Sequence, residues 1–141
     1  MPLPRGRAAV GVKGLGALQL LIAVNAIGGG VYGLTGAPDV PREWLAGSPF
    51  SSYLIPSLVL IVAVGGVHLV AAVRVWQRHP HARALSIGAG AILAGWIVVQ
   101  VAIIGYVSWL QPAMGAAALV ESALARRVIR SDAQPEQPAR P

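Results

Sequence analysis

The sequence predicts an all-α protein, a bundle of four transmembrane helices with both termini on the cytoplasmic side. Hydrophobic residues make up 55% of the 141-residue chain and charged residues only 11%, a balance outside that of water-soluble proteins. Long apolar runs alternate with short polar segments, and most basic residues gather in those segments. We therefore expect the lipid bilayer to be the surroundings of most of the chain.

Four segments are candidates for membrane spans, which need about 20 mostly apolar residues each. Segments 14–34 and 85–110 contain no charge, and in segment 53–73 His68 is the only group that titrates near neutral pH. The fourth segment, 112–127, has a shorter apolar part and contains Glu121. Hydropathy alone therefore leaves three spans or four.

The positions of the basic residues favour four spans, because Lys and Arg near span ends collect on the cytoplasmic side. With four spans, ten of the eleven basic residues fall on one side, and only Arg42 in the 35–52 connection falls on the other. With three spans, the cluster Arg126, Arg127 and Arg130 would have to cross the membrane. Both termini and the 74–83 loop are therefore predicted to be cytoplasmic.

Three regions follow from these spans: a basic cytoplasmic N-terminus at 1–13, a membrane domain at 14–130, and a disordered cytoplasmic tail at 131–141, which is rich in Pro, Gln and Glu. An alternative for the first span is a cleaved signal peptide ending near Val24-Asn25-Ala26. The apolar run continues to Leu34, which favours a span.

The 35–52 connection is predicted to be an interfacial loop on the outer side. Pro41 can open one helical turn that ends before Gly47. Trp and Tyr prefer the membrane interface, and the aromatic residues predicted near the outer face are Tyr32, Trp44, Phe50, Tyr53, Tyr106 and Trp109. A ligand-binding lid is the alternative interpretation of this loop.

Small residues recur at helical spacing in the first and third spans and predict faces where helices pack closely. The two sets are Gly16, Gln19, Ala23, Ala26, Gly30 and Gly33, and Gly88, Ala91, Gly95, Val98, Ala102 and Gly105. We expect Gly95 to lie at a helix contact. Gln100 lies about 180° away from its set, so we do not expect it to serve the same contact, and a second subunit could supply its hydrogen-bond partner. Gly28, Gly30 and Gly33 also match GxGxxG, but a span lacks the preceding strand that a dinucleotide site requires.

Three polar residues lie at a similar predicted depth, five residues from the cytoplasmic ends of their spans. Gln19, His68 and Glu121 would each sit about 7 to 8 Å below that interface, so they form a candidate buried polar layer in which His68 and Glu121 are paired. The alternative is that Glu121 extends toward Arg126 and the headgroups while His68 bonds a backbone carbonyl.

The remaining residues suggest no reaction centre. The chain has no cysteine, which excludes disulfides and thiolate chemistry. We predict no catalytic, cofactor-binding or metal-binding residues, because His79 and His81 flank Pro80 beside arginines and supply too few ligands. The basic residues lie between apolar runs rather than in one patch, so nucleic acid is not an expected partner.

Two stretches carry a resemblance to known proteins: WLAGSPFSSYLIPSLVL at 44–60 and IGYVSWLQP at 104–112. They resemble a group of small uncharacterised bacterial four-helix integral membrane proteins over about residues 28–125. The overall plan is loosely similar to the DoxX-type four-helix architecture. The resemblance implies four spans and implies no activity.

The expected function is that of a non-enzymatic structural, accessory or regulatory component of the bacterial inner membrane. Its expected partners are lipid and either a second copy or a larger membrane protein. The alternative is a small transporter or channel subunit that acts as an oligomer, since polar residues within spans can line a path.

Overall fold

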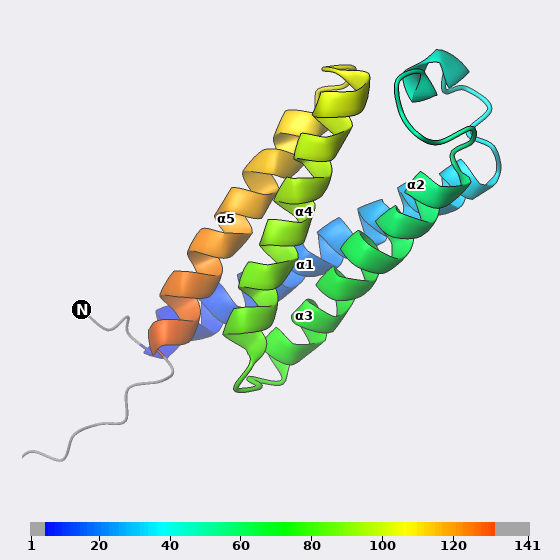
Figure 1. The fold of residues 1–141 in the computed structure, drawn as a ribbon. Coiled ribbons are helices and arrows are strands. Elements are labelled where there is room, and N and C mark those ends of the chain that lie inside the picture. The colour runs from blue at the N-terminus through cyan, green and yellow to red at the C-terminus, as the bar shows by residue number, and fades with distance from the viewer. Residues whose placement is uncertain (1–4, 132–141) are drawn as a thin grey trace, which may run out of the picture.

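The computed structural model describes residues 5–131, and this part of the chain contains helices and turns but no strand (Figure 1). The elements are α1 (Arg5–Leu34), the 3-10 turn η1 (Arg42–Leu45), α2 (Leu54–Val59), the π-helical segment η2 (Leu60–Gly66), α3 (Val67–Trp76), α4 (Ala82–Ile104) and α5 (Leu110–Ser131). Because α2, η2 and α3 follow one another without a break, they form one rod. The predicted all-α class is confirmed.

Three helical stretches are long and apolar enough to cross a membrane: Ala9–Leu34, Leu54–Trp76 and Ala82–Ile104. The fourth helix, α5, is less apolar because Glu121, Arg126 and Arg127 lie within it. Its 22 residues give it a length of about 33 Å, which matches the thickness of a hydrocarbon core.

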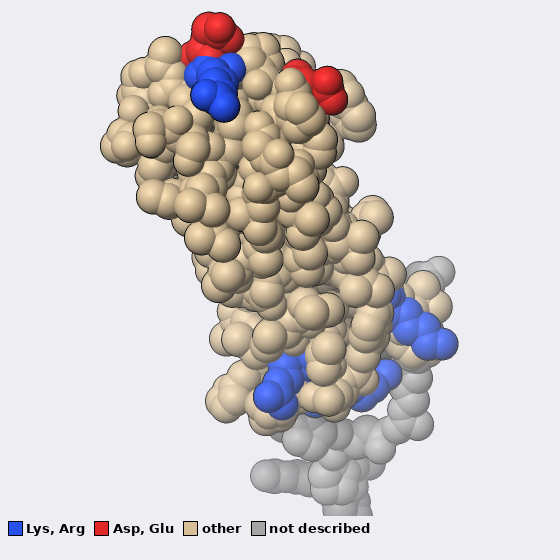
Figure 2. All heavy atoms as spheres, turned by 90° about the vertical axis from the view of Figure 1, so that its right-hand side faces the viewer, with Lys and Arg blue, Asp and Glu red and all other residues tan. Residues whose placement is uncertain are grey.

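Charge is separated along the long axis of the molecule. In the face drawn in Figure 2, Lys and Arg lie mainly at one end, the acidic residues lie at the other end with one basic side chain, and the surface between them shows no charge. The basic end holds the end of α3 with Arg74, the α3–α4 turn with Arg78 and the start of α4 with Arg83, and the opposite end holds the loop with Asp39 and Glu43.

The observed ends of the first two long helices differ from the predicted spans. α1 begins at Arg5, so residues 5–13 are helical and continue directly into the predicted first span. The rod that was predicted to end at 73 continues to Trp76. The predicted tail at 132–141 lies outside the described residues.

The prediction that the third span extends to residue 110 was wrong. α4 starts earlier, at Ala82, and ends at Ile104, because Gly105 takes a φ of 70° that a helix cannot continue. The Gln111 side chain then closes the turn: its oxygen accepts the Val107 and Ser108 N–H groups, and its amide donates to the Gly105 carbonyl. α5 therefore begins at Leu110, before Pro112, where a missing N–H costs no helical bond.

The predicted contact face of α1 is confirmed. Every member of its small-residue set is buried. A Cβ added at Gly16 would overlap the Trp76 indole, and one added at Gly30 would lie 2.9 Å from the Ser57 carbonyl oxygen. These glycines let α1 lie directly against the α2–α3 rod.

The predicted contact face of α4 was wrong. Gly95 and Ala91 are exposed, and a Cβ at Gly95 would meet nothing within 4 Å. The buried face lies on the other side of the helix and consists of Ala82, Ser86, Ala89, Gly90 and Leu93. Residue size did not distinguish the two faces, because both carry small residues. Gln100, on α4, is partly buried and lines a cavity of the bundle.

The loop between α1 and α2 contains the short helical turn that the sequence predicts. η1 follows Pro41 and ends before Gly47, which has a φ of 88°. The Tyr53 hydroxyl donates a hydrogen bond of 2.7 Å to the Pro41 carbonyl, and this bond joins the turn to the start of α2.

The packing of α1 predicts opposite effects for two glycines. Gly30→Ala should lower the free energy of unfolding by about 1 to 3 kcal/mol, because the new methyl group meets backbone at Ser57 and the side chain of Ile61. Gly95→Ala is the matched control and should leave stability unchanged or raise it by up to about 1 kcal/mol. Unfolding in mild detergent measures both, and equal losses would contradict this packing.

Candidate functional site

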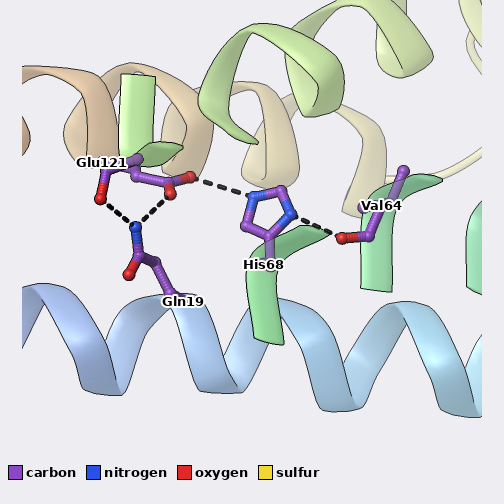
Figure 3. Close-up of polar contacts among 5 residues, drawn as sticks. Gln19, Val64, His68 and Glu121 are labelled. Carbon is purple, nitrogen blue, oxygen red and sulfur yellow. Dashed lines mark hydrogen bonds and ion pairs between the residues drawn. The ribbon is translucent and has the colours of Figure 1, made fainter. Parts of the chain in front are cut away.

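The structure brings Gln19, His68 and Glu121 together in the interior of the bundle, and it adds Ser86 (Figure 3). These four residues, which we name the polar layer, come from α1, α3, α5 and α4 respectively. Each of them has an exposed fraction of 0%. Every long helix thus contributes one polar side chain to a site that no solvent reaches.

Hydrogen bonds connect the polar layer across the bundle. The Gln19 amide Nε2 donates to Ser86 Oγ at 2.8 Å and to Glu121 Oε1 at 2.7 Å. The His68 Nε2 lies 3.1 Å from Glu121 Oε2. Neighbouring helices in the ring are α1 and α3, α3 and α4, α4 and α5, and α5 and α1. The contacts of Gln19 with Ser86 and of His68 with Glu121 therefore join helices that lie diagonally opposite each other.

The contact that the Nδ1 atom of His68 makes determines which nitrogens of the ring carry protons. Nδ1 lies 2.7 Å from the Val64 carbonyl oxygen, which can only accept, so Nδ1 carries a proton. Nε2 then either carries a second proton and faces a carboxylate, or it is bare and accepts a proton from a neutral Glu121. In both states one proton lies between Nε2 and Oε2, and the pair has no net charge.

The helix is unusual directly before His68. Residues Leu60–Gly66 form a π-helical segment, and its Val64 carbonyl is the acceptor for Nδ1. Within this segment Gly65 lies against the Ile27 side chain of α1, where a Cβ would come within 2.6 Å. Single π-helical turns inside α-helices occur frequently at functional sites, and here the turn adjoins the residue that shares a proton with Glu121.

Two apolar clusters seal the polar layer along the bundle axis. The cluster toward the basic end consists of Val12, Leu15, Val75, Ala82, Ala125 and Val128. The cluster on the other side consists of Ile22, Ala26, Val64, Leu93 and Ala118. On α1, for example, Gln19 lies one turn from Leu15 and one turn from Ile22. The polar groups are therefore separated from both ends of the molecule by packed hydrocarbon.

One polar atom of the layer lacks a partner. The Gln19 Oε1 is buried without a hydrogen bond among the described residues, although both protons of the same amide are used. Next to the layer, Gly90 lets α4 lie close to α5, because a Cβ there would come within 2.5 Å of Ser122 Oγ and 3.1 Å of the Ala118 carbonyl oxygen.

Sequence reasoning missed Ser86 and Gly90. The third span was predicted to start at residue 85, which placed Ser86 at the membrane surface. The helix starts at Ala82 instead, so Ser86 lies one turn deeper, at the depth of Gln19. The available signal in the sequence was helical spacing: Ser86 lies four residues after Ala82 and three residues before Ala89, so the three residues share one face of the helix.

The two alternatives for His68 and Glu121 each describe part of the site. His68 bonds a backbone carbonyl through Nδ1, as one alternative states, and it meets Glu121 through Nε2, as the other states. Glu121 does not extend toward Arg126, because its side chain is completely buried.

The other candidate residues lie away from the polar layer. His79 and His81 are in the turn between α3 and α4, with ring centroids 5.3 Å apart. Within residues 5–131 no three His, Asp or Glu side chains are grouped closely enough to hold a metal ion. Asn25 and Gln100 line a cavity in the other half of the bundle.

Comparisons with known proteins identify no relative: no family model, no curated protein and no solved structure matches this chain.

The geometry of the polar layer predicts energetic coupling between His68 and Glu121. Each of the substitutions His68→Ala and Glu121→Ala leaves a buried polar partner unpaired and should cost about 3 to 5 kcal/mol of the free energy of unfolding. The double variant should cost at least about 1 kcal/mol less than the sum, measured by SDS titration in mild detergent. Glu43→Ala, in the exposed loop, is the control. Additivity within about 0.5 kcal/mol would show that the two residues are independent.

Proposed function

We propose that this chain is a four-span protein of the bacterial inner membrane, with both termini in the cytoplasm, that serves as a non-enzymatic structural, accessory or regulatory component. In this proposal it packs against a second copy or a larger membrane protein. The hydrogen bonds of the polar layer hold the four helices in register.

The observation that carries the proposal is the complete burial of the polar layer between two apolar clusters. Residues that conduct an ion or a solute line a path that water can enter. Here the polar side chains hydrogen-bond to one another across both diagonals of the bundle. Such an arrangement favours a rigid scaffold over a conducting pore.

The proposed topology is supported by the charge distribution and by the length of α5. Arg74 lies near the end of α3, and Arg126 and Arg127 lie near the end of α5; both helix ends are at the same end of the molecule (Figure 1), the end that the positive-inside rule assigns to the cytoplasm. A spanning α5 keeps the basic residues on that side. Its one acid, Glu121, is paired inside the bundle and does not face lipid.

Cysteine labelling tests this topology, since the chain has no cysteine of its own. Ser51→Cys, in the exposed loop before α2, should react with an impermeant thiol reagent in intact cells. Gln77→Cys, in the α3–α4 turn, and Ser131→Cys, at the end of α5, should react only after the membrane is opened. Labelling of Ser131→Cys in intact cells would show that α5 does not span.

A small transporter or channel is the second candidate, and one observation favours it: the 3.1 Å contact between His68 Nε2 and Glu121 Oε2 inside the bundle. Acids and histidines that share protons inside membrane helices are typical of proton relays.

Flux measurements separate the two functions. Liposomes containing the purified protein, a trapped pH-sensitive dye and an imposed potassium diffusion potential should acidify no faster than empty liposomes, because the apolar clusters block the polar layer on both sides. Proton entry above that background, if abolished by Glu121→Gln, would favour the transporter and overturn the scaffold.

A further inference from the structure

Each long helix carries a basic residue three to six residues from its member of the polar layer, on the side toward the basic end. At about 1.5 Å per residue, these basic residues lie about 5 to 9 Å beyond that layer along the bundle axis. All of them are exposed or half-buried. We name this set the basic collar, and its members are Lys13 of α1, Arg74 of α3, Arg83 of α4 and Arg126 of α5.

The basic collar lies at the level expected of lipid phosphate groups. Counting residues from the predicted span ends places the polar layer about 7 to 8 Å inside the membrane surface, which puts the collar at that surface. Trp76 supports this level, because it follows Arg74 by two residues and is 45% exposed, and tryptophan prefers the membrane interface.

The described acidic residues do not neutralise the basic collar. Asp39 and Glu43 lie in the loop at the opposite end of the molecule, and Glu121 is buried against His68. Arg78 and Arg127 are further basic residues at the end that carries the collar. Within residues 5–131, this end therefore presents positive charge and no accessible carboxylate (Figure 2).

We propose that the basic collar binds the phosphate groups of anionic phospholipids in the leaflet that surrounds it. A guanidinium group can donate two parallel hydrogen bonds to one phosphate group. The four side chains come from four helices arranged in a ring, so lipids on each side of the bundle meet one of them. This distribution suits a surrounding leaflet better than one soluble ligand. The inference rests on the proposed membrane location and extends it by a preference for one class of lipid.

Spin-labelled lipids measure this preference. The protein is reconstituted in phosphatidylcholine bilayers that contain a trace of spin-labelled phosphatidylglycerol or of phosphatidylcholine with the same label, and the immobilised fractions give the affinity ratio of the two lipids. One basic residue beside an anionic headgroup corresponds to about fivefold in affinity. Because lipids that do not touch the collar lower the mean, wild-type protein should favour phosphatidylglycerol by about two- to fivefold.

Salt tests the ionic origin of the preference without any variant. In about 1 M NaCl the screening length is about 3 Å, so the affinity ratio should fall toward one. A ratio of one at low salt, or a ratio that salt does not change, would overturn the proposal.

Two matched variants test whether the collar is the site. Arg126→Gln should lower the affinity ratio, and replacing all four collar residues by glutamine should bring it close to one. Arg42→Gln also removes one exposed arginine, but from the opposite end of the molecule, and should leave the ratio unchanged. Equal ratios for Arg126→Gln and Arg42→Gln would contradict a site at the collar.

Inorganic phosphate distinguishes a lipid headgroup from a soluble anion as the occupant. Added at constant ionic strength, it should leave the affinity ratio unchanged, and a fall of the ratio would indicate a free-phosphate site and overturn the lipid site. Cysteine labelling reports the topology independently. A chain that spans four times but shows no lipid preference would therefore contradict this inference and leave the proposed function intact.

Discussion

The burial of Glu121 is the constraint on which the rest of the bundle depends. A carboxyl group inside an apolar bundle must have all its hydrogen bonds supplied by protein, and here Gln19 and His68 supply them from two other helices. A shift of α5 by one residue would move the carboxyl group about 1.5 Å along the axis and turn it by about 100°. Both contacts would then be lost, so the position of this one acid determines the register of α5.

The diagonal contacts explain why a polar layer is better suited to this role than an apolar one. Apolar side chains at the centre of four helices pack in several registers with similar energy, because dispersion has no direction. The bonds from Gln19 to Ser86 and from His68 to Glu121 each require two particular atoms to meet across the bundle. Polar residues at single interior positions specify helix register in coiled coils by the same principle.

The shape of the bundle follows from the sizes of the residues on either side of this layer. Toward the basic end, Ala71, Ala72 and Ala125 are fully buried, and such small residues allow close approach of helices. Beyond the layer, the facing residues include Trp96, Leu60 and Met114, which hold the helices apart and leave the cavity. The closely packed half holds the polar layer in place, and the wider half contains the cavity.

Sequence reasoning was accurate for the position of polar residues along the bundle axis. Counting residues from the predicted cytoplasmic ends of the spans placed Gln19, His68 and Glu121 at one level, and they meet in the structure. Ser86 was missed because the start of its helix was predicted three residues late, nearly one full turn.

Faces were harder to predict than depth. On α1 the polar Gln19 lay within the small-residue set and marked its buried side, whereas on α4 the chosen set around Gly95 held no polar residue. Both faces of α4 are rich in small residues, so size carried no information about direction. The position of Gln19, and not the size of its neighbours, indicated which face of α1 is buried.

The proton between His68 and Glu121 connects the structure to both candidate functions. Because Nδ1 donates to the Val64 carbonyl, the pair is neutral whether the shared proton lies on nitrogen or on oxygen. Moving that proton between them changes no net charge, which is why the pair tolerates a low-dielectric interior. Net movement of charge would require proton exchange with water. The path to water is blocked by Leu15 on one side of the layer and by Ile22 on the other, and each of these side chains is at most 2% exposed. The two apolar clusters therefore distinguish a scaffold from a transporter more clearly than the His68–Glu121 pair does. If water could pass through either cluster, His68 and Glu121 would form a proton relay.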